Sequence, residues 1–300
     1  MKKNEHSNVI VYIFAILAML FWGLTFIWSK IVFEYWNPIA TITIRLIISA
    51  FLLFLYLLLF DRKQLKFPKG KVKLFLLTAF FEPFLYFIGE SFGLQRVDAS
   101  ITSVIISTIP VFTAIVGIYY FRERLSKLNL FGVVVSFSGV ILMLLNQEFR
   151  FSASTEGVML LFLAVLSAIG YGIAIKKISE DYNPIFIIFV QNLIGFFYFL
   201  PLFLIFDLNC VIQTKINFEL ASSVLMLSVL GSSLAFIFYI NSIRKIGIAK
   251  ANVFTNLIPI FTAIAAFIIL GEKFTYIKTT GMILAILGVY LTQRKKMTNS

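Results

Sequence analysis

The sequence has little of what most metal, redox and catalytic sites need. A single cysteine, Cys210, and a single histidine, His6, occur among the 300 residues. A lone cysteine cannot form an internal disulfide, and the two residues together do not make the usual zinc, haem or iron–sulfur ligand sets. We therefore expect no metal and no cofactor. Charged residues make up only 13% of the chain, whereas a soluble domain normally carries about 25%.

Motifs that are typical of enzymes are also absent from the sequence. It holds no G-x-x-x-x-G-K-[ST] phosphate loop, no H-E-x-x-H zinc motif and no G-x-S-x-G nucleophile turn. These absences predict that the protein is not an enzyme. The formal net charge of +12 comes from short basic clusters between apolar runs and not from a basic domain, which argues against nucleic acid as a partner.

Long apolar runs are what the sequence has in abundance. Apolar residues make up 60% of the chain, and a membrane-spanning helix needs about 20 of them in succession. Ten runs qualify, at 9–33, 38–60, 73–95, 99–121, 127–146, 157–176, 184–206, 218–243, 250–271 and 276–293. The sequence therefore predicts an all-α integral membrane protein of ten transmembrane helices, embedded in a lipid bilayer.

The distribution of lysine and arginine predicts how these helices are oriented. With the N-terminus inside, roughly three times as many Lys and Arg residues fall on the inner side as on the outer side. The basic connection around 61–73 and the C-terminal cluster 294–296 both lie on that inner side. We therefore expect a multi-pass protein of the bacterial cytoplasmic (inner) membrane with both termini in the cytoplasm.

The second half of the chain repeats a pattern of the first half. The segment IPVFTAIVGIYYFRERL aligns without a gap to IPIFTAIAAFIILGEKF. In this register Pro110 matches Pro259 and Glu123 matches Glu272. Downstream, Gly132 and Gly139 match Gly281 and Gly288. Such agreement in Pro, Glu and Gly positions indicates an internal duplication.

The duplication predicts two five-helix repeats, 1–148 and 149–300. Because five is an odd number, the second repeat must enter the membrane from the opposite side, and inverted repeats of this kind are common in secondary transporters. Asn37 and Asn183 occupy equivalent places, each before a proline that opens an apolar run, and we expect each asparagine to cap its helix.

Three segments give the chain a family resemblance. FWGLTFIWSK in the first run, GLQRVDASITSVIISTIPVFTAI ahead of the repeat, and the two matched glutamates resemble the EamA type of the drug/metabolite transporter superfamily. The resemblance implies ten helices in two inverted halves that move small organic solutes, often outward. It predicts a secondary transporter, an exporter of metabolites such as amino acids or amines, working by alternating access of a midplane cavity. The alternative is a non-transporting membrane receptor or assembly subunit.

Ionisable side chains inside a membrane span are candidates for function, and the run 73–95 carries two glutamates. Glu82 lies roughly 13 Å along the helix from Lys73, near the bilayer centre. Pro83 follows it and predicts a kink that could line a cavity. Two interpretations of Glu82 stay open: a carboxylate that binds a proton or a substrate amine, or a structural carboxyl bonded to a neighbouring helix.

Arg45 and Glu90 are predicted at similar depths in neighbouring spans. A buried arginine needs a counter-charge, and Glu90 is the expected partner. The pair is interpreted either as a structural ion pair or as a clamp for the carboxylate and amine of a zwitterion. Lys30, near the outer end of the first run, either snorkels to the surface or contributes to the site.

Aromatic and uncharged polar side chains complete the candidate cavity. Trp22 and Tyr86 either stack on an aromatic or cationic solute or pack at the lipid surface. Polar side chains of the later spans either line the cavity or hold helices together; these are Gln191, Asn192, Tyr239, Asn252 and Asn256. Pro83, Pro110 and Pro259 are interpreted either as hinges or as static kinks.

Two small-residue spacings predict close helix packing. Gly132 and Gly281 are each followed, four positions later, by another small residue. We expect the helices at 127–146 and 276–293 to form a scaffold or a homodimer contact, and not to line the solute path. The other expected partners are a small-molecule substrate and protons.

Overall fold

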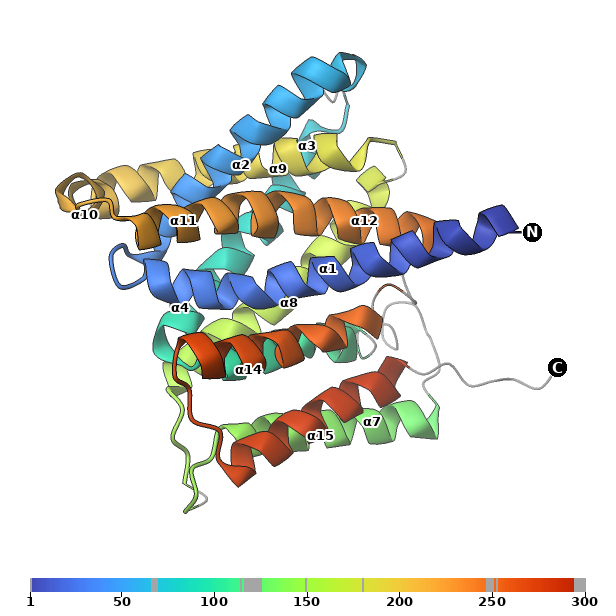
Figure 1. Cartoon of the computed structure of the whole chain (residues 1–300), viewed down its shortest axis with the longest axis vertical. Helices are drawn as coiled ribbons and strands as arrows, with labels where there is room; N and C mark the ends of the chain where they lie inside the picture. Colours follow the sequence, from blue (N-terminus) through green and yellow to red (C-terminus); the bar gives the residue numbers. More distant parts are fainter. Residues whose placement is uncertain are drawn as a thin grey trace.

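The protein is almost entirely helical (Figure 1). The computed structural model describes residues 2–65, 70–113, 115, 126–148, 150–179, 181–246, 251 and 253–293. The helical segments are α1 (Lys2–Val32), α2 (Pro38–Phe60), η1 (Arg62–Gln64), α3 (Val72–Ala79), η2 (Phe80–Leu85), α4 (Tyr86–Arg96), α5 (Ala99–Ser107), α7 (Lys127–Met143), α8 (Thr155–Ser179), α9 (Pro184–Leu202), η3 (Phe203–Asp207), α10 (Leu208–Gln213), α11 (Phe218–Met226), η4 (Leu227–Leu234), α12 (Ala235–Ile246), η5 (Phe254–Asn256), α14 (Leu257–Ile269) and α15 (Tyr276–Gln293). This agrees with the predicted all-α class.

Within the described residues, six helices are long and apolar enough to cross a membrane. They are Ile10–Val32, Pro38–Phe60, Val72–Arg96, Thr155–Ile175, Pro184–Gln213 and Phe218–Ile246, and shorter apolar helices cover Ala99–Thr113, Lys127–Met143 and Phe254–Ile269. Large apolar side chains project from the bundle, with Phe60 75%, Ile205 72% and Ile268 72% exposed. An apolar exterior of this extent fits a multi-pass membrane protein.

Helices from the two halves of the chain pack against each other in pairs. α1 packs on α12, α2 on α9, α4 on α8, α5 on α14, and α7 on α15. Along the long axis of the molecule, α2 and α9 lie at one extreme, and α7 and α15 lie at the other (Figure 1). The described start of α1 and the described end of α15 point toward the same end of the helices (Figure 1).

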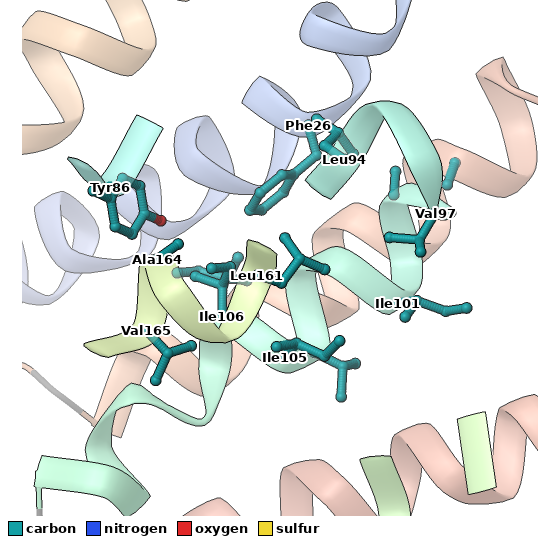
Figure 2. Packing of buried hydrophobic residues seen from close by; sticks show 14 of the residues in the cluster. Phe26, Tyr86, Leu94, Val97, Ile101, Ile105, Ile106, Leu161, Ala164 and Val165 are labelled. Carbon is teal, nitrogen blue, oxygen red and sulfur yellow. The ribbon is translucent and has the colours of Figure 1, made fainter. Parts of the chain in front are cut away.

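The core lies where α1, α4, α5 and α8 meet. Figure 2 shows Phe26 of α1, Leu94 of α4, Ile105 of α5 and Leu161 of α8 converging on one another, each no more than 3% exposed. Branched and aromatic side chains from four helices thereby fill one continuous apolar cluster. This cluster fixes α4, which carries Tyr86 and Glu90.

The α7–α15 pair is held by glycine contacts, as the small-residue spacing predicts. A Cβ atom on Gly139 would lie 2.5 Å from the carbonyl oxygen of Gly281, and one on Gly132 would lie 2.8 Å from that of Gly288. The two backbones are therefore too close for any larger side chain. Val134, on the outer face of α7, is 62% exposed, so this pair forms an edge of the molecule.

The start of α2 differs from the prediction that Asn37 caps it. Asn37 makes no cap with its side chain; its Nδ2 donates to Asp207 at 3.0 Å, and Asp207 accepts the Ala40 N–H at 2.8 Å. Asp207 thus satisfies a free N–H group of this helix end, that of Ala40. At the start of α9 the expected cap is present, because Asn183 accepts the Ile185 N–H at 3.0 Å.

Pro110 and Pro259 each lie close to the start of a helical segment. α5 ends at Ser107, the chain turns at Thr108, and residues 109–113 are helical again. Pro259 is the third residue of α14, directly after the 3₁₀ turn η5. Proline is tolerated in a first helical turn, where its missing N–H breaks no hydrogen bond. The matching positions agree with the sequence repeat, and their role as hinges stays a prediction.

Candidate functional site

The helix from Val72 to Arg96 is broken at Glu82. The backbone there is non-helical, with φ −141° and ψ 117°, and the flanking residues form the π-helical segment η2 between α3 and α4. The kink predicted at Pro83 is therefore present, centred on the residue before it. Because a proline cannot donate a hydrogen bond and restricts the residue before it, this point cannot continue a regular helix.

Two helices from later in the chain bond to the carbonyl groups exposed by the break. The Ser167 hydroxyl of α8 donates to the Phe81 carbonyl at 2.6 Å, and the Gln191 Nε2 of α9 is 3.4 Å from the Glu82 carbonyl oxygen. Carbonyl groups inside an apolar bundle need such partners, since no lipid group can donate to them. The break is thus stabilised by hydrogen bonds from the neighbouring helices α8 and α9.

Two glycines make room for the broken segment. A Cβ atom on Gly170 of α8 would lie 2.7 Å from the ring of Phe81, and one on Gly195 of α9 would run into the Pro83 ring. Neither position could hold a side chain without moving η2. This close packing against η2 explains why α8 and α9 each carry a glycine in the middle of a regular helix.

A cavity of about 20 Å³ lies beside Glu82. Its wall consists of Glu82, Pro83, Phe87, Tyr171, Ile188, Gln191, Asn192, Ser232 and Phe236. The Tyr171 hydroxyl is 3.4 Å from the Gln191 Oε1, and the Glu82 side chain is partly buried. The space holds about one water molecule, so in this conformation the cavity is too small for an organic solute.

Arg45 and Glu90 are both buried near this cavity, at 4% and 7% exposure. The Arg45 Nε donates to the Ser232 hydroxyl at 2.9 Å, and its guanidinium lies 4.5 Å from the centre of the Phe87 ring. The Tyr86 hydroxyl lies close to the Glu90 carboxyl group. Arg45 and Glu90 attract each other electrostatically, but no direct ion pair joins them within the part of the chain that the structure describes. Their mutual attraction therefore acts without direct contact, beside the polar and aromatic contacts of Arg45.

Gln191 and Asn192, adjacent in sequence, make different contacts. Gln191 bonds to Tyr171 and the helix break, as described above. The Asn192 Nδ2 donates to the Ser49 hydroxyl at 2.8 Å and to the Ser232 carbonyl at 3.2 Å. Asn192 therefore ties α2, α9 and η4 together while one edge of it still lines the cavity. This pair of residues thus both lines the cavity and holds helices together.

Aromatic side chains of α1 and α12 stand behind the cavity. The ring of Trp22 meets those of Phe236 and Tyr239 edge-on, with centroid distances of 5.1 and 5.0 Å. Phe236 lines the cavity directly, and Tyr239 and Tyr171 lie within electrostatic range of Glu82. Trp22 and Tyr86 are not among the residues that line the cavity.

The remaining predicted residues lie elsewhere. Asn256 is 8% exposed, and its Nδ2 donates to the Val253 carbonyl at 3.0 Å and to the Gln293 Oε1 at 3.2 Å. It joins η5 to α15 and is not part of the cavity wall. Asn252 lies outside the described residues.

Lys30 belongs to a second, larger hollow of about 380 Å³ at the end of the bundle where α1 ends. The other residues that line this hollow are Phe33, Glu34, Gln95, Asp98, Leu270 and Glu272. Glu272, matched to Glu123 in the sequence repeat, caps α5 by accepting the Ala99 N–H and the Ser100 hydroxyl, both at 2.6 Å.

Sequence reasoning missed the apolar wall residues Phe87, Ile188 and Phe236, and it missed three polar residues of the cavity region: Ser167, Tyr171 and Ser232. The signal for the first two was available, since residues four apart share one face of a helix and Gly170 lies between them on an otherwise apolar helix. Ser232 gave no such signal, because serines are common in membrane helices. Only the packing of η4 against α2 brings it to Arg45.

Comparisons with known proteins agree with this architecture. The model of the EamA-like transporter family matches residues 9–145 and 155–294. An uncharacterized transporter of Archaeoglobus fulgidus is 26% identical over 283 residues, which cover 93% of this chain and 97% of that protein. The uncharacterized transporter YcxC of Bacillus subtilis is 28% identical over 291 residues, covering 95% and 93%. A crystal structure with a TM-score of 0.68 covers 94% of this chain and 96% of its own at 11% identity, a likeness that shows the fold alone.

Proposed function

The chain belongs to the EamA-like transporter family, and from this premise we propose that it is a secondary transporter that exports small organic metabolites, such as amino acids or amines, across the bacterial cytoplasmic membrane. The observation that carries the proposal is the place of Glu82, an ionisable side chain at a helix break that faces a cavity. Ionisable groups inside membrane spans mark solute paths and proton relays. Glu82 is assigned to bind either a proton or the amine of the solute.

The proposed architecture has ten spans in two inverted repeats, 1–148 and 149–300. Packing supports it, because α2, α5 and α7 each contact the helix that is their counterpart in the second repeat. Two hydrogen bonds between the repeats also support it, because they join equivalent positions: Asn37 donates to Asp207, and Asn183 donates to Asp61 at 3.4 Å. A two-fold axis in the membrane plane produces such paired contacts, and in transporters of this type the substrate site lies on that axis.

The proposed cycle is alternating access of the cavity beside Glu82. Because this cavity holds only about one water molecule, a solute can occupy it only after the helices around it move apart. The break at Glu82 and the two matched prolines, Pro110 and Pro259, are the points assigned to that motion. The positive-inside pattern supports a topology with both termini in the cytoplasm.

Transport by purified protein in liposomes tests the proposal. Efflux and uptake of labelled amino acids and small amines are measured with and without an imposed pH gradient. We expect saturable flux that follows the gradient, and we expect Glu82→Gln to abolish the dependence on the gradient. Glu156→Gln is the matched control, because Glu156 is an exposed partner of Arg96 and is not part of the cavity wall. Gradient-dependent flux in Glu82→Gln would remove Glu82 from this role.

A further inference from the structure

The hollow at the end of α1 differs from the cavity at Glu82 in size. It measures about 380 Å³ against about 20 Å³, and small-molecule pockets in proteins have volumes of roughly 300–1,000 Å³. The hollow is thus large enough for a small organic solute in the conformation described. Its walls come from the end of α1, the α4–α5 connection and the α14–α15 connection.

Two of its three carboxylates are already engaged. Glu272 accepts hydrogen bonds from the first residues of α5, at 2.6 Å from both the Ala99 N and the Ser100 Oγ. Asp98 forms an ion pair with Lys278. These contacts attach the α14–α15 connection to the start of α5.

Lys30 and Glu34 are the charges that remain. Lys30 lies in the last turn of α1, and Glu34 lies in the turn that follows the helix, where the Glu34 N–H donates to the Ile31 carbonyl at 3.2 Å. Both line the hollow, yet within the described ranges neither is joined by a hydrogen bond or a direct ion pair to another side chain. Lys30 is attracted electrostatically by Asp98 and Glu272, and Glu34 is exposed. A base and an acid thus line the same hollow, and a ligand can bond to both.

The rest of the wall narrows the class of ligand. Phe33 and Leu270 give the hollow apolar surface, and Gln95 adds a neutral polar group. Counting the charges of Lys30, Lys278, Glu34, Asp98 and Glu272, the site has two bases and three acids, so it does not favour an anion. A molecule that carries one ammonium and one carboxylate next to an apolar group matches each of these features.

We propose that this hollow is a binding site for a small zwitterion with an apolar side chain, whose carboxylate is bound by Lys30 and whose ammonium is bound by Glu34. The site is separate from the cavity at Glu82, with which it shares no wall residue. Binding follows from the hollow alone; the role of the site as a station on the solute path rests on the proposed function.

Equilibrium binding to the purified full-length protein in detergent tests the site without any transport. The probes are labelled glycine, L-leucine and L-phenylalanine, together with two analogues of leucine that each keep one charge: leucinamide, a cation, and 4-methylpentanoate, an anion. We expect saturable binding of leucine or phenylalanine, and binding at least about tenfold weaker for both single-charge analogues. No saturable binding of any of the three amino acids, or equal binding of leucinamide and leucine, would overturn the proposal.

Variants assign the binding to one of the two cavities. Lys30→Gln and Glu34→Gln are each expected to weaken amino-acid binding at least about tenfold, and Glu82→Gln reports separately on the cavity at Glu82. The matched control is Glu148→Gln with Arg150→Gln, which removes an exposed acid and base pair that takes no part in the wall. Binding lost in Glu82→Gln but kept in the other two variants would place the ligand at Glu82 and refute this site. A protein that binds but shows no flux would keep the site and refute the transport proposal.

Discussion

The carboxylate of Asp207 accepts the side-chain amide of Asn37 at 3.0 Å, although the two residues are 170 positions apart. The same carboxylate accepts the Ala40 N–H at 2.8 Å, so the end of the α9 segment caps the start of α2. At the opposite ends of the same two helices, Asp61 accepts the side-chain amide of Asn183 at 3.4 Å. α2 and α9 are thus tied to each other at both ends and, through Ser49 and Asn192, in the middle.

Asp207→Ala is expected to destabilise the protein more than Asp61→Ala. Asp207 is 2% exposed, and its removal leaves buried donors unsatisfied, at a cost of about 1–3 kcal/mol. Asp61 is less buried and makes the longer contact. Midpoints of thermal unfolding in detergent give the comparison, and equal midpoints for the two variants would contradict this account of the α2 cap.

Gly139→Ala and Gly172→Ala are expected to change stability in opposite directions. A Cβ atom at Gly139 would collide with the backbone of α15, whereas one at Gly172 of α8 meets nothing within 4 Å. Overpacking costs about 1–3 kcal/mol, and replacing a helical glycine in open space gains about 0.5–1 kcal/mol. Unfolding in a denaturant series measures both. A stable Gly139→Ala protein would show that α7 and α15 can separate freely.

Arg45→Met is expected to destabilise the fold, and the additional change Glu90→Gln is expected to recover part of the loss. Leaving one buried charge without its compensating partner costs about 3–5 kcal/mol. The Arg45 contacts with Ser232 and Phe87 are lost in both proteins, so only the charge on Glu90 differs between them. The measurement is the fraction of monodisperse protein that remains after heating. If the double variant is no more stable than Arg45→Met, the attraction between the two residues does not matter for folding.

Ser167→Ala is expected to reduce solute flux more than it reduces stability. Losing one hydrogen bond to the Phe81 carbonyl costs about 1 kcal/mol, but this bond fixes the helix break to α8 directly beside Glu82. Flux is measured per folded protein in liposomes. Ser222→Ala serves as control, because Ser222 bonds a carbonyl of its own helix at 3.1 Å on the exposed surface. Equal flux in both variants would show that the hydrogen bond at the helix break is not needed for transport.

The sequence predicted several local features with accuracy. The expected runs 38–60 and 276–293 coincide with α2 and α15, because twenty or so apolar residues between polar connections have few alternatives to a helix in a membrane. The kink at Pro83 and the close contact at Gly132 and Gly281 were likewise predictable, since proline and glycine act through their own backbone geometry.

Contacts between distant residues were less predictable. Glu90 was expected as the counter-charge of Arg45, and the two residues attract each other. The contacts of the Arg45 guanidinium with Ser232 and Phe87 were not predicted. Asn37 was expected to cap α2, yet Asp207 does so. In both cases the pattern gave the depth of a residue along its own helix but not the rotation of that helix about its axis, and rotation decides which side chains meet.

The sequence by itself determined that the chain is helical, where most spans begin and end, and that an ionisable residue lies at a proline in mid-span, because these properties depend on hydrophobicity and backbone chemistry within about one helix length. Only the tertiary structure decided which polar groups surround Glu82, that its cavity is closed to about one water molecule, and that Lys30 and Glu34 share a larger hollow. Those features arise where three or more helices pack together, and the packing of each helix depends on all of its neighbours at once.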